Sequence, residues 1–471
     1  MASRKPASAP SGEPQLQVNV SVEDLEVGEG QRDETNLLER RIPAIATPLS
    51  WKNPRSNIQK LAATFWSFLI LGMADSYYIV LLPELQEYYK KSHLAVSLLF
   101  LSPVAGFITT ALLTDFIHQY LGRRGGAMVA CTLQLVACIA AGTHPPFYGL
   151  IPIFALLGLS GGIKVPSWNS FVGSLERSNE LLGLLNGFYA LGATLMPPMA
   201  RALIDCGFQW HLVYYILVFL VFTEGVFSVH AFIRETAAVY RVSAMPPAAP
   251  VAIELQPLPA AGRKPANAQD AASRTLSLTA QCLKEKVVLI CGASLLLCLG
   301  SQAALGGWVT KYISEVRHGS DQTSLHVATG FWAGITLGRM SLGFVTPYLF
   351  KTEMHSAIIY VSAALVLEFL FWFVSNIVSA AIVIGIMGFF LGPLYPCAVV
   401  CICRMSPSHM RIVAIGICAA IGAVGAYTLP LAVGAVAESE GIVVVQAALG
   451  TCLLFCGLVW FFNVIHDKGR S

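Results

Sequence analysis

One carboxylate lies deep within the first long apolar stretch of the sequence. Asp75 stands about two-thirds of the way along residues 60–82, which otherwise have the composition of a membrane-crossing helix. An ionisable group at that depth costs free energy, so it normally faces a water-filled cavity or a partner of opposite charge. Two interpretations stay open. Either Asp75 binds or couples a substrate in a central pathway, or it belongs to a structural ion pair.

A lysine in the fourth apolar stretch is the candidate partner of this carboxylate. At ~1.5 Å of rise per residue, Asp75 lies roughly 20 Å and Lys164 roughly 12 Å from the inner ends of their predicted helices. A lysine side chain can span that difference if both helices line one cavity. The pair would make both charges tolerable and would offer polar groups to a neutral polyol or an anion. A static bridge within the first half of the chain is the equally weighted alternative.

Three further ionisable side chains fall inside apolar stretches. Arg339 and Glu368 lie at comparable depths on consecutive predicted helices, so they are candidates for a second ion pair, for which we favour a structural role. Glu224 has no evident partner in the sequence, because His230 is almost two helical turns away. We assign Glu224 no role.

Amide and indole side chains occur in the same stretches. Amides supply hydrogen-bond donors and acceptors for hydroxyl groups, and an aromatic face packs against the apolar side of a sugar ring. Five residues are therefore candidates for a solute site: Trp168, Asn169, Asn186, Gln302 and Trp308. Anchoring at the membrane interface is the alternative for the two tryptophans, and it is stronger for Trp308, which lies near the end of its stretch.

A charged turn separates the second and third apolar stretches. It reads Asp115-x6-Gly122-Arg123-Arg124, and we predict charge–dipole contacts there that stabilise the state closed on the inner side. Prolines inside later stretches bend helices, which helps rocking or gating, although packing alone also explains them: Pro197, Pro396 and Pro430.

The elements that must position these residues are membrane helices. The chain has 471 residues, of which 55% are hydrophobic and only 12% are charged, whereas a soluble protein carries about a quarter charged residues. Blocks of about 20 apolar residues match the thickness of the hydrocarbon layer. We predict an all-α polytopic membrane protein with twelve spans, placed near 60–82, 94–117, 126–144, 147–172, 181–204, 210–233, 286–310, 325–349, 355–375, 377–403, 411–436 and 442–465.

The two halves of the chain repeat one another. Gly162-x-x-x-Pro166 matches Gly392-x-x-x-Pro396 at an offset of 230, and Gly192-Ala193 matches Gly425-Ala426 at an offset of 233. A third, looser match of Ala105-Gly106-x-x-Thr109 with Ala333-Gly334-x-Thr336 has an offset of 228, and this offset places Gln302 one residue from the counterpart of Asp75. We therefore predict two six-helix bundles, a layout in which the site lies at the midplane between repeats. The expected parts are a disordered tail 1–58, a bundle 59–233, a flexible linker 234–283, a bundle 284–466 and a short tail 467–471.

Charge and motif content narrow the localisation and the partners. Lysines and arginines concentrate on one side of the predicted spans, which places both termini and the linker in the cytoplasm. Asp33-Glu34-Thr35-Asn36-Leu37-Leu38 fits an acidic dileucine signal, so a vacuolar or endosomal membrane stands beside the plasma membrane as the expected location. The net charge of +3 indicates no nucleic-acid partner, and we expect a monomer.

No enzyme or cofactor chemistry is indicated. The ten histidines are scattered and the twelve cysteines lack metal-site spacing. A Gly-rich phosphate loop ending in Gly-Lys-Ser or Gly-Lys-Thr does not occur. We therefore expect no catalytic residues, no metal and no cofactor.

At this point the sequence resembles the major facilitator superfamily, in particular its fucose permease-like branch with fungal members. The likeness covers nearly all of residues 60–465, and the Asp115 turn looks like a stretched form of the signature between the second and third helices. The motifs that carry it are Gly72-x-x-Asp75, Gly158-x-x-Gly161-Gly162-x6-Asn169, Leu185-Asn186-Gly187, Gly307-Trp308, Gly338-Arg339 and Gly388-x3-Gly392-Pro393-x-x-Pro396.

The resemblance implies a twelve-helix alternating-access carrier. In the fucose permease, an aspartate in the first helix and a glutamate in the fourth serve substrate recognition and proton coupling. Asp75 matches the aspartate, but Lys164 occupies the place aligned with the glutamate, and a lysine cannot repeat its part as a proton-shuttling acid. Facilitated diffusion, or proton coupling through Asp75 alone, stays open.

Three functional hypotheses follow. The first is a secondary active or facilitative transporter of a small solute such as a sugar or polyol, with a proton as the candidate coupling ion. The second is a multidrug or metabolite exporter of the same fold. The third is a non-transporting membrane sensor, which the long polar tail and linker do not favour.

Overall fold

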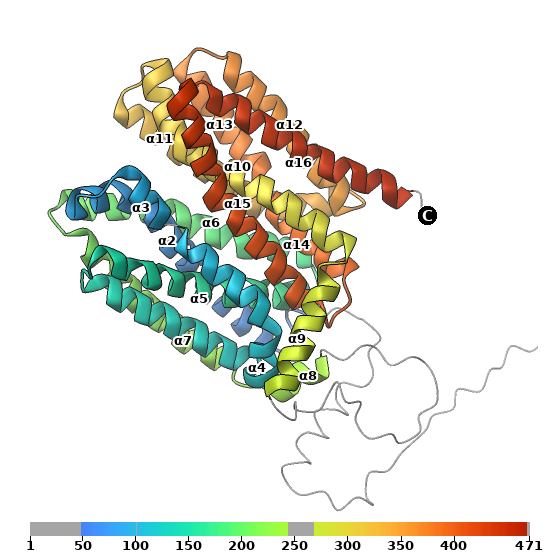
Figure 1. Cartoon of the computed structure of the whole chain (residues 1–471). Coiled ribbons are helices and arrows are strands. Elements are labelled where there is room, and N and C mark those ends of the chain that lie inside the picture. Colours follow the sequence, from blue (N-terminus) through green and yellow to red (C-terminus); the bar gives the residue numbers. More distant parts are fainter. Residues whose placement is uncertain (1–48, 100, 244–267, 469–471) are drawn as a thin grey trace, which may run out of the picture. The chain divides into compact units, whose positions relative to one another are not determined.

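Helices make up most of the described chain (Figure 1). The computed structural model describes residues 49–99, 101–243 and 268–468, which lie in a single contact unit beginning at Ala46. The first half consists of α2 (Ser56–Tyr89), α3 (His93–Leu99), α4 (Ser102–Gly142), α5 (Leu150–Gly173), α6 (Ser178–Asp205) and α7 (Val213–Ala231). Within this half, α2 packs against α6 and α7, and α4 packs against α5 and α7.

The second half repeats this arrangement with one interrupted helix. Its elements are α10 (Lys286–Arg317), α11 (Asp321–Leu349), α12 (Glu353–Phe373), α13 (Ile377–Leu391), α14 (Leu394–Met405), α15 (Arg411–Glu440) and α16 (Val444–Lys468). The predicted span 377–403 is thus divided into α13 and α14 at Gly392-Pro393, because the proline ring cannot continue the hydrogen-bond ladder. The side chain of Asn376 caps α13 by accepting from the backbone N–H groups of Val378 and Ser379.

The predicted turn between the second and third spans is a kink within α4. Gly122 has φ +67° there, a left-handed conformation that glycine adopts without strain. A Cβ atom at this position would lie 2.4 Å from the backbone carbon of Thr236. Glycine is therefore required twice, once by the dihedral angle and once by the close approach of the chain that follows α7.

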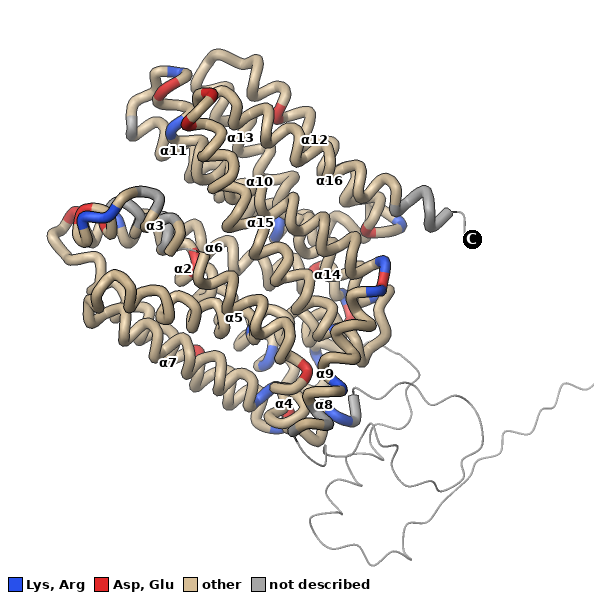
Figure 2. Tube along the Cα trace, viewed as in Figure 1, with Lys and Arg blue, Asp and Glu red and all other residues tan. Residues whose placement is uncertain are grey.

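Eight helical stretches of the described residues are long and apolar enough to cross a membrane. The 41-residue α4 is long enough for two of the predicted spans. Large apolar side chains are exposed on the outer faces of several helices, as lipid contact requires: Phe219, Val366, Phe373 and Phe462. Figure 2 shows most charged residues near the ends of the helices. The all-α polytopic fold class is confirmed.

The linker contains two helices where the sequence predicted irregular chain. α8 (Ala237–Ser243) packs against α4, and α9 (Ala268–Cys282) packs against both α4 and α15. Leu278 and Cys282 of α9 are buried, so this stretch is held by packing and the expectation of flexibility is wrong for it. Residues 244–267 of the linker and 1–48 of the tail lie outside the described residues. We call the end of the bundle that carries α8 and α9 the linker end.

The two halves meet along several helix pairs. α6 packs against α11 and α14, α15 packs against α4 and α5, and α5 also contacts α14. Gly183 of α6 and Gly343 of α11 allow a close approach, since a Cβ atom on Gly343 would lie 3.0 Å from the Cα atom of Gly183. Thr194 and Thr336 add a hydrogen bond of 3.1 Å between the same two helices. Helices from both halves therefore surround the polar residues described next.

Candidate functional site

Asp75 lies on α2 at its contact with α6. Its side chain is partly exposed, and the Tyr189 hydroxyl donates a hydrogen bond of 2.9 Å to Asp75 Oδ2. Glycines set this geometry, because a Cβ atom on Gly72 would lie 1.9 Å from the Tyr189 carbonyl oxygen and one on Gly192 would lie 2.0 Å from the Leu69 carbonyl oxygen. Small residues thus bring α2 and α6 close enough for Tyr189 to reach the carboxylate.

Lys164 pairs with a different carboxylate. Its ammonium lies 2.6 Å from Glu224 Oε1, and the two side chains are 1% and 0% exposed. Lys164 also donates to Gln134 Oε1. The suggested Asp75–Lys164 pair is therefore wrong, and Glu224, which had no evident partner in the sequence, has one. The reason is tertiary packing: α4 lies against both α5 and α7, which brings these two charges together inside the first half.

Trp168 belongs to the same buried network. Its indole N–H donates to Ser67 Oγ at 3.0 Å, and Ser67 in turn donates to Glu224 Oε1 at 2.6 Å. The Trp168 ring is almost fully buried and lies against Phe232. In this conformation it offers no face to a solute. Lys164, Glu224 and Trp168 therefore connect helices of the first half in this conformation, and the substrate-binding roles expected of Lys164 and Trp168 stay predictions.

Arg339 lies at the junction between the halves. Its guanidinium donates to the Asn186 carbonyl oxygen at 3.4 Å, to the Gly392 carbonyl oxygen at 3.3 Å and to Gln302 Oε1 at 3.3 Å. It also lies over the Tyr189 ring, 5.8 Å from the centroid. Within the described ranges no carboxylate pairs with it. Neutral oxygen atoms thus accept the hydrogen bonds of the nearly buried Arg339 guanidinium. The guanidinium lies next to Tyr189, the residue that donates to Asp75.

The second suggested ion pair, between Arg339 and Glu368, is also wrong. α13 packs against both α11 and α12, and the two side chains project to different surroundings. Arg339 contacts groups on α6 and α10, whereas Glu368 faces α16. Comparable depth on consecutive helices therefore does not imply proximity.

The predicted site residues with amide side chains are connected through Arg339, which donates to the backbone carbonyl of Asn186 and to the side chain of Gln302. Asn186 Nδ2 donates to Asn169 Oδ1 at 3.2 Å, and Gln302 Nε2 donates to the Leu391 carbonyl oxygen at 3.0 Å. Arg339 contacts both Asn186 and Gln302, so these contacts cross from α5 and α6 to α10 and α11. Trp308 lies apart from them, because its indole N–H donates to the Pro430 carbonyl oxygen at 3.1 Å and packs α10 against α15.

Two tyrosines of this region were missed by the sequence reasoning. Tyr189 supplies the hydrogen bond to Asp75, and Tyr427 of α15 packs against the cluster of buried residues that includes Met73 and Ala74. Tyr189 lies three positions after Asn186, on the same face of α6. That spacing was the available signal. Tyr427 carried no comparable pattern.

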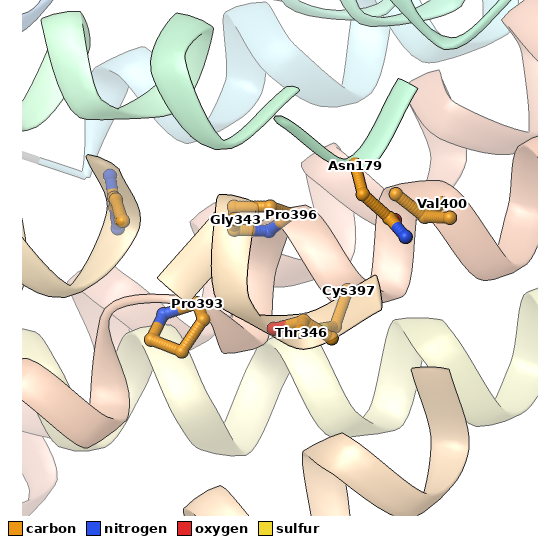
Figure 3. A pocket seen from close by; sticks show the side chains of 8 residues that line it. Asn179, Gly343, Thr346, Pro393, Pro396, Cys397 and Val400 are labelled. Atoms are coloured by element: carbon orange, nitrogen blue, oxygen red, sulfur yellow. The ribbon is translucent and has the colours of Figure 1, made fainter. Parts of the chain in front are cut away.

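A small pocket adjoins Arg339 (Figure 3). Its wall combines Asn179 of α6, Gly343 and Thr346 of α11, and residues from Pro393 to Val400. Pro396 is among the latter, which gives it a place beside the junction of the halves. Pro197 lies within α6 and Pro430 within α15. Their roles in gating stay predictions.

Asp115 is an acceptor for the linker helices. The Tyr240 hydroxyl of α8 donates to its Oδ1 at 3.0 Å, the Thr275 hydroxyl of α9 donates to its Oδ2 at 3.5 Å, and Gln119 Nε2 also donates to Oδ2. The sequence predicted charge–dipole contacts here, and the structure replaces them with side-chain hydrogen bonds. Burial and the neighbouring Asp115 carboxylate raise the pKa of Tyr240, which keeps its hydroxyl a donor.

The two arginines after the kink hold the segment between α7 and α8. Glu235 accepts from the Arg124 backbone N–H at 3.2 Å, and its carboxylate lies 3.8 Å from Arg123 and 2.6 Å from Lys60. Arg241 of α8 donates to the Gln119 carbonyl oxygen at 2.9 Å. The motif residues therefore fix α8 against α4 at the linker end.

The arrangement at the junction can recognise a polar molecule. Asp75 offers an acceptor, Tyr189 a hydroxyl and Arg339 a cation, with amides from both halves beside them. The described residues contain no group of three or more His, Cys, Asp or Glu side chains placed to hold a metal ion. Recognition there would rest on hydrogen bonds and charge.

A profile of the Major Facilitator Superfamily matches residues 64–367. The Saccharomyces cerevisiae protein called Bypass of stop codon protein 6 is 27% identical over 444 residues, covering 90% of this chain and 86% of its own length.

Two solved structures illustrate the shared fold. The transporter FucP in the outward conformation has a TM-score of 0.64 at 14% identity, covering 85% of this chain and 98% of that one. The human organic anion transporter MFSD10 has a TM-score of 0.64 at 13% identity, covering 86% and 99%.

Proposed function

Because the chain belongs to the Major Facilitator Superfamily, a family of membrane transporters, we propose that it moves a small polar solute by alternating access. The proposed site lies between the two six-helix halves and comprises Asp75, Tyr189, Arg339, Asn186 and Gln302. The observation that carries the proposal is the position of Asp75. Its carboxylate is partly exposed and accepts a hydrogen bond from the neutral hydroxyl of Tyr189, whose ring lies under Arg339 of the second half.

A hydroxylated solute such as a sugar or polyol fits these groups. Each solute hydroxyl donates one hydrogen bond and accepts others, and the site offers a carboxylate acceptor beside a guanidinium donor and two amides. Asn169 Oδ1 accepts a hydrogen bond from the Asn186 side-chain amide and so fixes the orientation of that amide. Bidentate contacts of this kind impose geometric selectivity as well as affinity.

Asp75 is the proposed carrier of a coupling proton. Lys164 forms its ion pair with Glu224 at 2.6 Å, so the side-chain hydrogen bond that Asp75 accepts comes from the neutral hydroxyl of Tyr189. A carboxyl group in a low-dielectric site that opens alternately to two compartments can take up and release a proton. Facilitated diffusion is the alternative, and the two differ in whether solute movement acidifies the receiving compartment.

An organic anion is the second candidate substrate. The specific observation in its favour is Arg339, a nearly buried guanidinium that pairs with no carboxylate within the described residues. The name of the human relative of the same fold, an organic anion transporter, is compatible with this choice. An anion would form an ion pair with the Arg339 guanidinium, whereas the hydroxyl groups of a polyol would donate hydrogen bonds mainly to the Asp75 carboxylate.

The topology proposed for this transporter puts the linker end in the cytoplasm. The supporting feature is the excess of basic residues on that side. The tail 1–58, the bundles 59–233 and 284–466 and the linker between them remain the proposed division. A plasma, vacuolar or endosomal membrane is the proposed location, with the protein acting as a monomer.

The experiment that tests the proposal uses purified full-length protein in liposomes that contain a pH-sensitive dye. One panel contains labelled monosaccharides and polyols, and a second contains organic anions. Uptake from the first panel with acidification of the lumen supports proton symport of a polyol, and uptake without acidification supports facilitation. Uptake from the second panel alone supports the anion. If no compound of either panel is taken up or exported, the result contradicts the proposal and favours a sensor.

A further inference from the structure

A groove on the outer surface between α12 and α16 contains two buried polar side chains. Glu368 and Gln446 line it from the two helices, and it encloses about 550 Å³ of space, part of it open to the exterior. Glu368 lies five residues before the end of α12 at Phe373, and Gln446 is the third residue of α16. Both therefore sit near the end of the bundle opposite the linker end.

Neither side chain has a hydrogen-bond partner among the described residues. Both carboxylate oxygens of Glu368 and both terminal atoms of Gln446 are buried and unpaired, and the two residues are 1% and 0% exposed. No ion pair of the described ranges includes Glu368. An unpaired carboxylate and an unpaired amide in an apolar setting are each costly. Their common position in one groove indicates a missing ligand.

The rim of the groove faces lipid. Phe369, Trp372 and Leu454 line it and are 47%, 39% and 49% exposed. In a membrane these side chains contact acyl chains, so the groove is entered from the bilayer rather than from the central site. Its occupant must carry an apolar chain beside a polar head.

The chemistry of the groove selects a cation. The two oxygens of Glu368 and the carbonyl oxygen of Gln446 make three acceptors, which match the three N–H donors of a primary ammonium. The Trp372 ring can add a cation–π contact. A neutral hydroxyl would donate a single hydrogen bond and leave the carboxylate charge without compensation.

We propose that this groove binds the primary ammonium head of a membrane amphiphile, with Glu368 as its counter-ion, Gln446 as a further acceptor and Trp372 beside it. The site is separate from the transport pathway, and the proposal does not depend on which solute is carried. The same head group can come from an ethanolamine phospholipid or from a free long-chain amine.

Native mass spectrometry of the full-length protein tests the proposal. Phospholipids of identical acyl chains are offered with ethanolamine, N-methyl, N,N-dimethyl and choline heads, and a long-chain primary amine forms a separate arm. We expect retention to fall with methylation, by at least about tenfold between ethanolamine and choline, since losing even one charge-assisted hydrogen bond supplies that ratio. Retention of the amine alone, with no phospholipid preference, supports the site and assigns its source to free amines.

Variants locate the binding. Glu368→Gln keeps the shape and removes the charge, and Gln446→Leu removes the further acceptor; each is expected to abolish the head-group preference. Trp372→Leu provides a third, exposed position should a buried replacement fail to fold. Glu440→Gln removes an exposed carboxylate at the end of α15 and is the matched control, expected to keep the preference. The proposal is overturned if the parent protein shows neither a phospholipid head-group preference nor retention of the long-chain amine, or if a preference survives all three replacements.

Discussion

The hydrogen bond between Tyr189 and Asp75 is the smallest unit on which the proposed site depends. Tyr189→Phe removes the hydroxyl at 2.9 Å from Asp75 Oδ2 and keeps the ring under Arg339. Losing one hydrogen bond to a charged group costs about tenfold in an equilibrium constant. We expect the KM for the transported solute to rise by roughly that factor.

The control for this measurement is Tyr148→Phe. Tyr148 lies in the short helix Phe147–Gly149 before α5 and is 71% exposed, and its hydroxyl makes no hydrogen bond within the described chain. Initial uptake rates at several solute concentrations separate KM from the maximal rate. An unchanged KM in Tyr189→Phe would remove Tyr189 from the site.

The buried Lys164–Glu224 pair is predicted to act on stability rather than on recognition. Removing one member of a buried pair leaves an uncompensated charge and costs about 3–5 kcal/mol. Lys164→Met and Glu224→Gln should therefore each lower the unfolding temperature strongly, and the double replacement should recover much of the loss. Thermal unfolding of purified protein measures this. Single variants as stable as the parent, with altered solute selectivity, would return Lys164 to the pathway.

At the scale of elements, α9 joins the halves at the linker end. Its Thr275 hydroxyl donates to Asp115 on α4, and its Cys282 thiol lies 3.9 Å from the Met410 carbonyl oxygen before α15. Any conformational change that separates α4 from α15 must release one side of α9. The packing of this helix is thus a reporter of the state of the linker end.

Cys282 offers a direct measurement of α9 packing. Burial raises the pKa of its thiol from 9.0 to about 12, so the thiolate forms only when the pH rises toward that value. At neutral pH this lowers the reactive thiolate fraction about a thousandfold. A maleimide should therefore modify the exposed Cys206 quickly and Cys282 very slowly. Thr275→Ala should accelerate modification of Cys282 and leave Cys206 unchanged. Equal rates in the parent protein would contradict a docked α9.

The sequence allowed the helices to be predicted better than the side-chain contacts between them. Apolar blocks of span length predicted the helices, because the bilayer fixes their length and composition. Depth along a helix, however, does not give the direction in which a side chain points. Lys164 and Glu224 meet only because α4 lies against both α5 and α7, and Arg339 and Glu368 are kept apart because α13 packs on both of their helices.

Sequence reasoning also missed structure where hydrophobicity was low. α9 has few apolar residues, and its register is set by Leu278 and Cys282 docking against other helices. Asn186 and Gln302, predicted as site residues, both contact Arg339, through the Asn186 backbone carbonyl and the Gln302 side chain. Polar residues inside the spans could therefore be recognised as unusual from the sequence. Their hydrogen-bond and ion-pair partners could be identified only from the tertiary structure.

At the scale of the whole molecule, alternating access requires the halves to separate at the linker end. The contacts that must break there include Asp115–Thr275, Asn179–Glu353 and the close approach of Gly183 to Gly343. Arg339 lies between these contacts and Asp75, so movement of α6 against α11 would change its distance from the carboxylate. Solute binding and opening are coupled if the solute bridges Asp75 and Arg339.

The most direct test of this account is solute uptake by Asp75→Asn in liposomes, beside the control Asp205→Asn at the exposed end of α6. Asparagine keeps the size of the side chain and removes its charge and its ability to carry a proton. We predict that Asp75→Asn folds, as judged by its unfolding temperature, and loses at least about tenfold in uptake rate, while Asp205→Asn transports like the parent. Uptake by a folded Asp75→Asn variant at the parent rate would contradict a transport site built on this carboxylate.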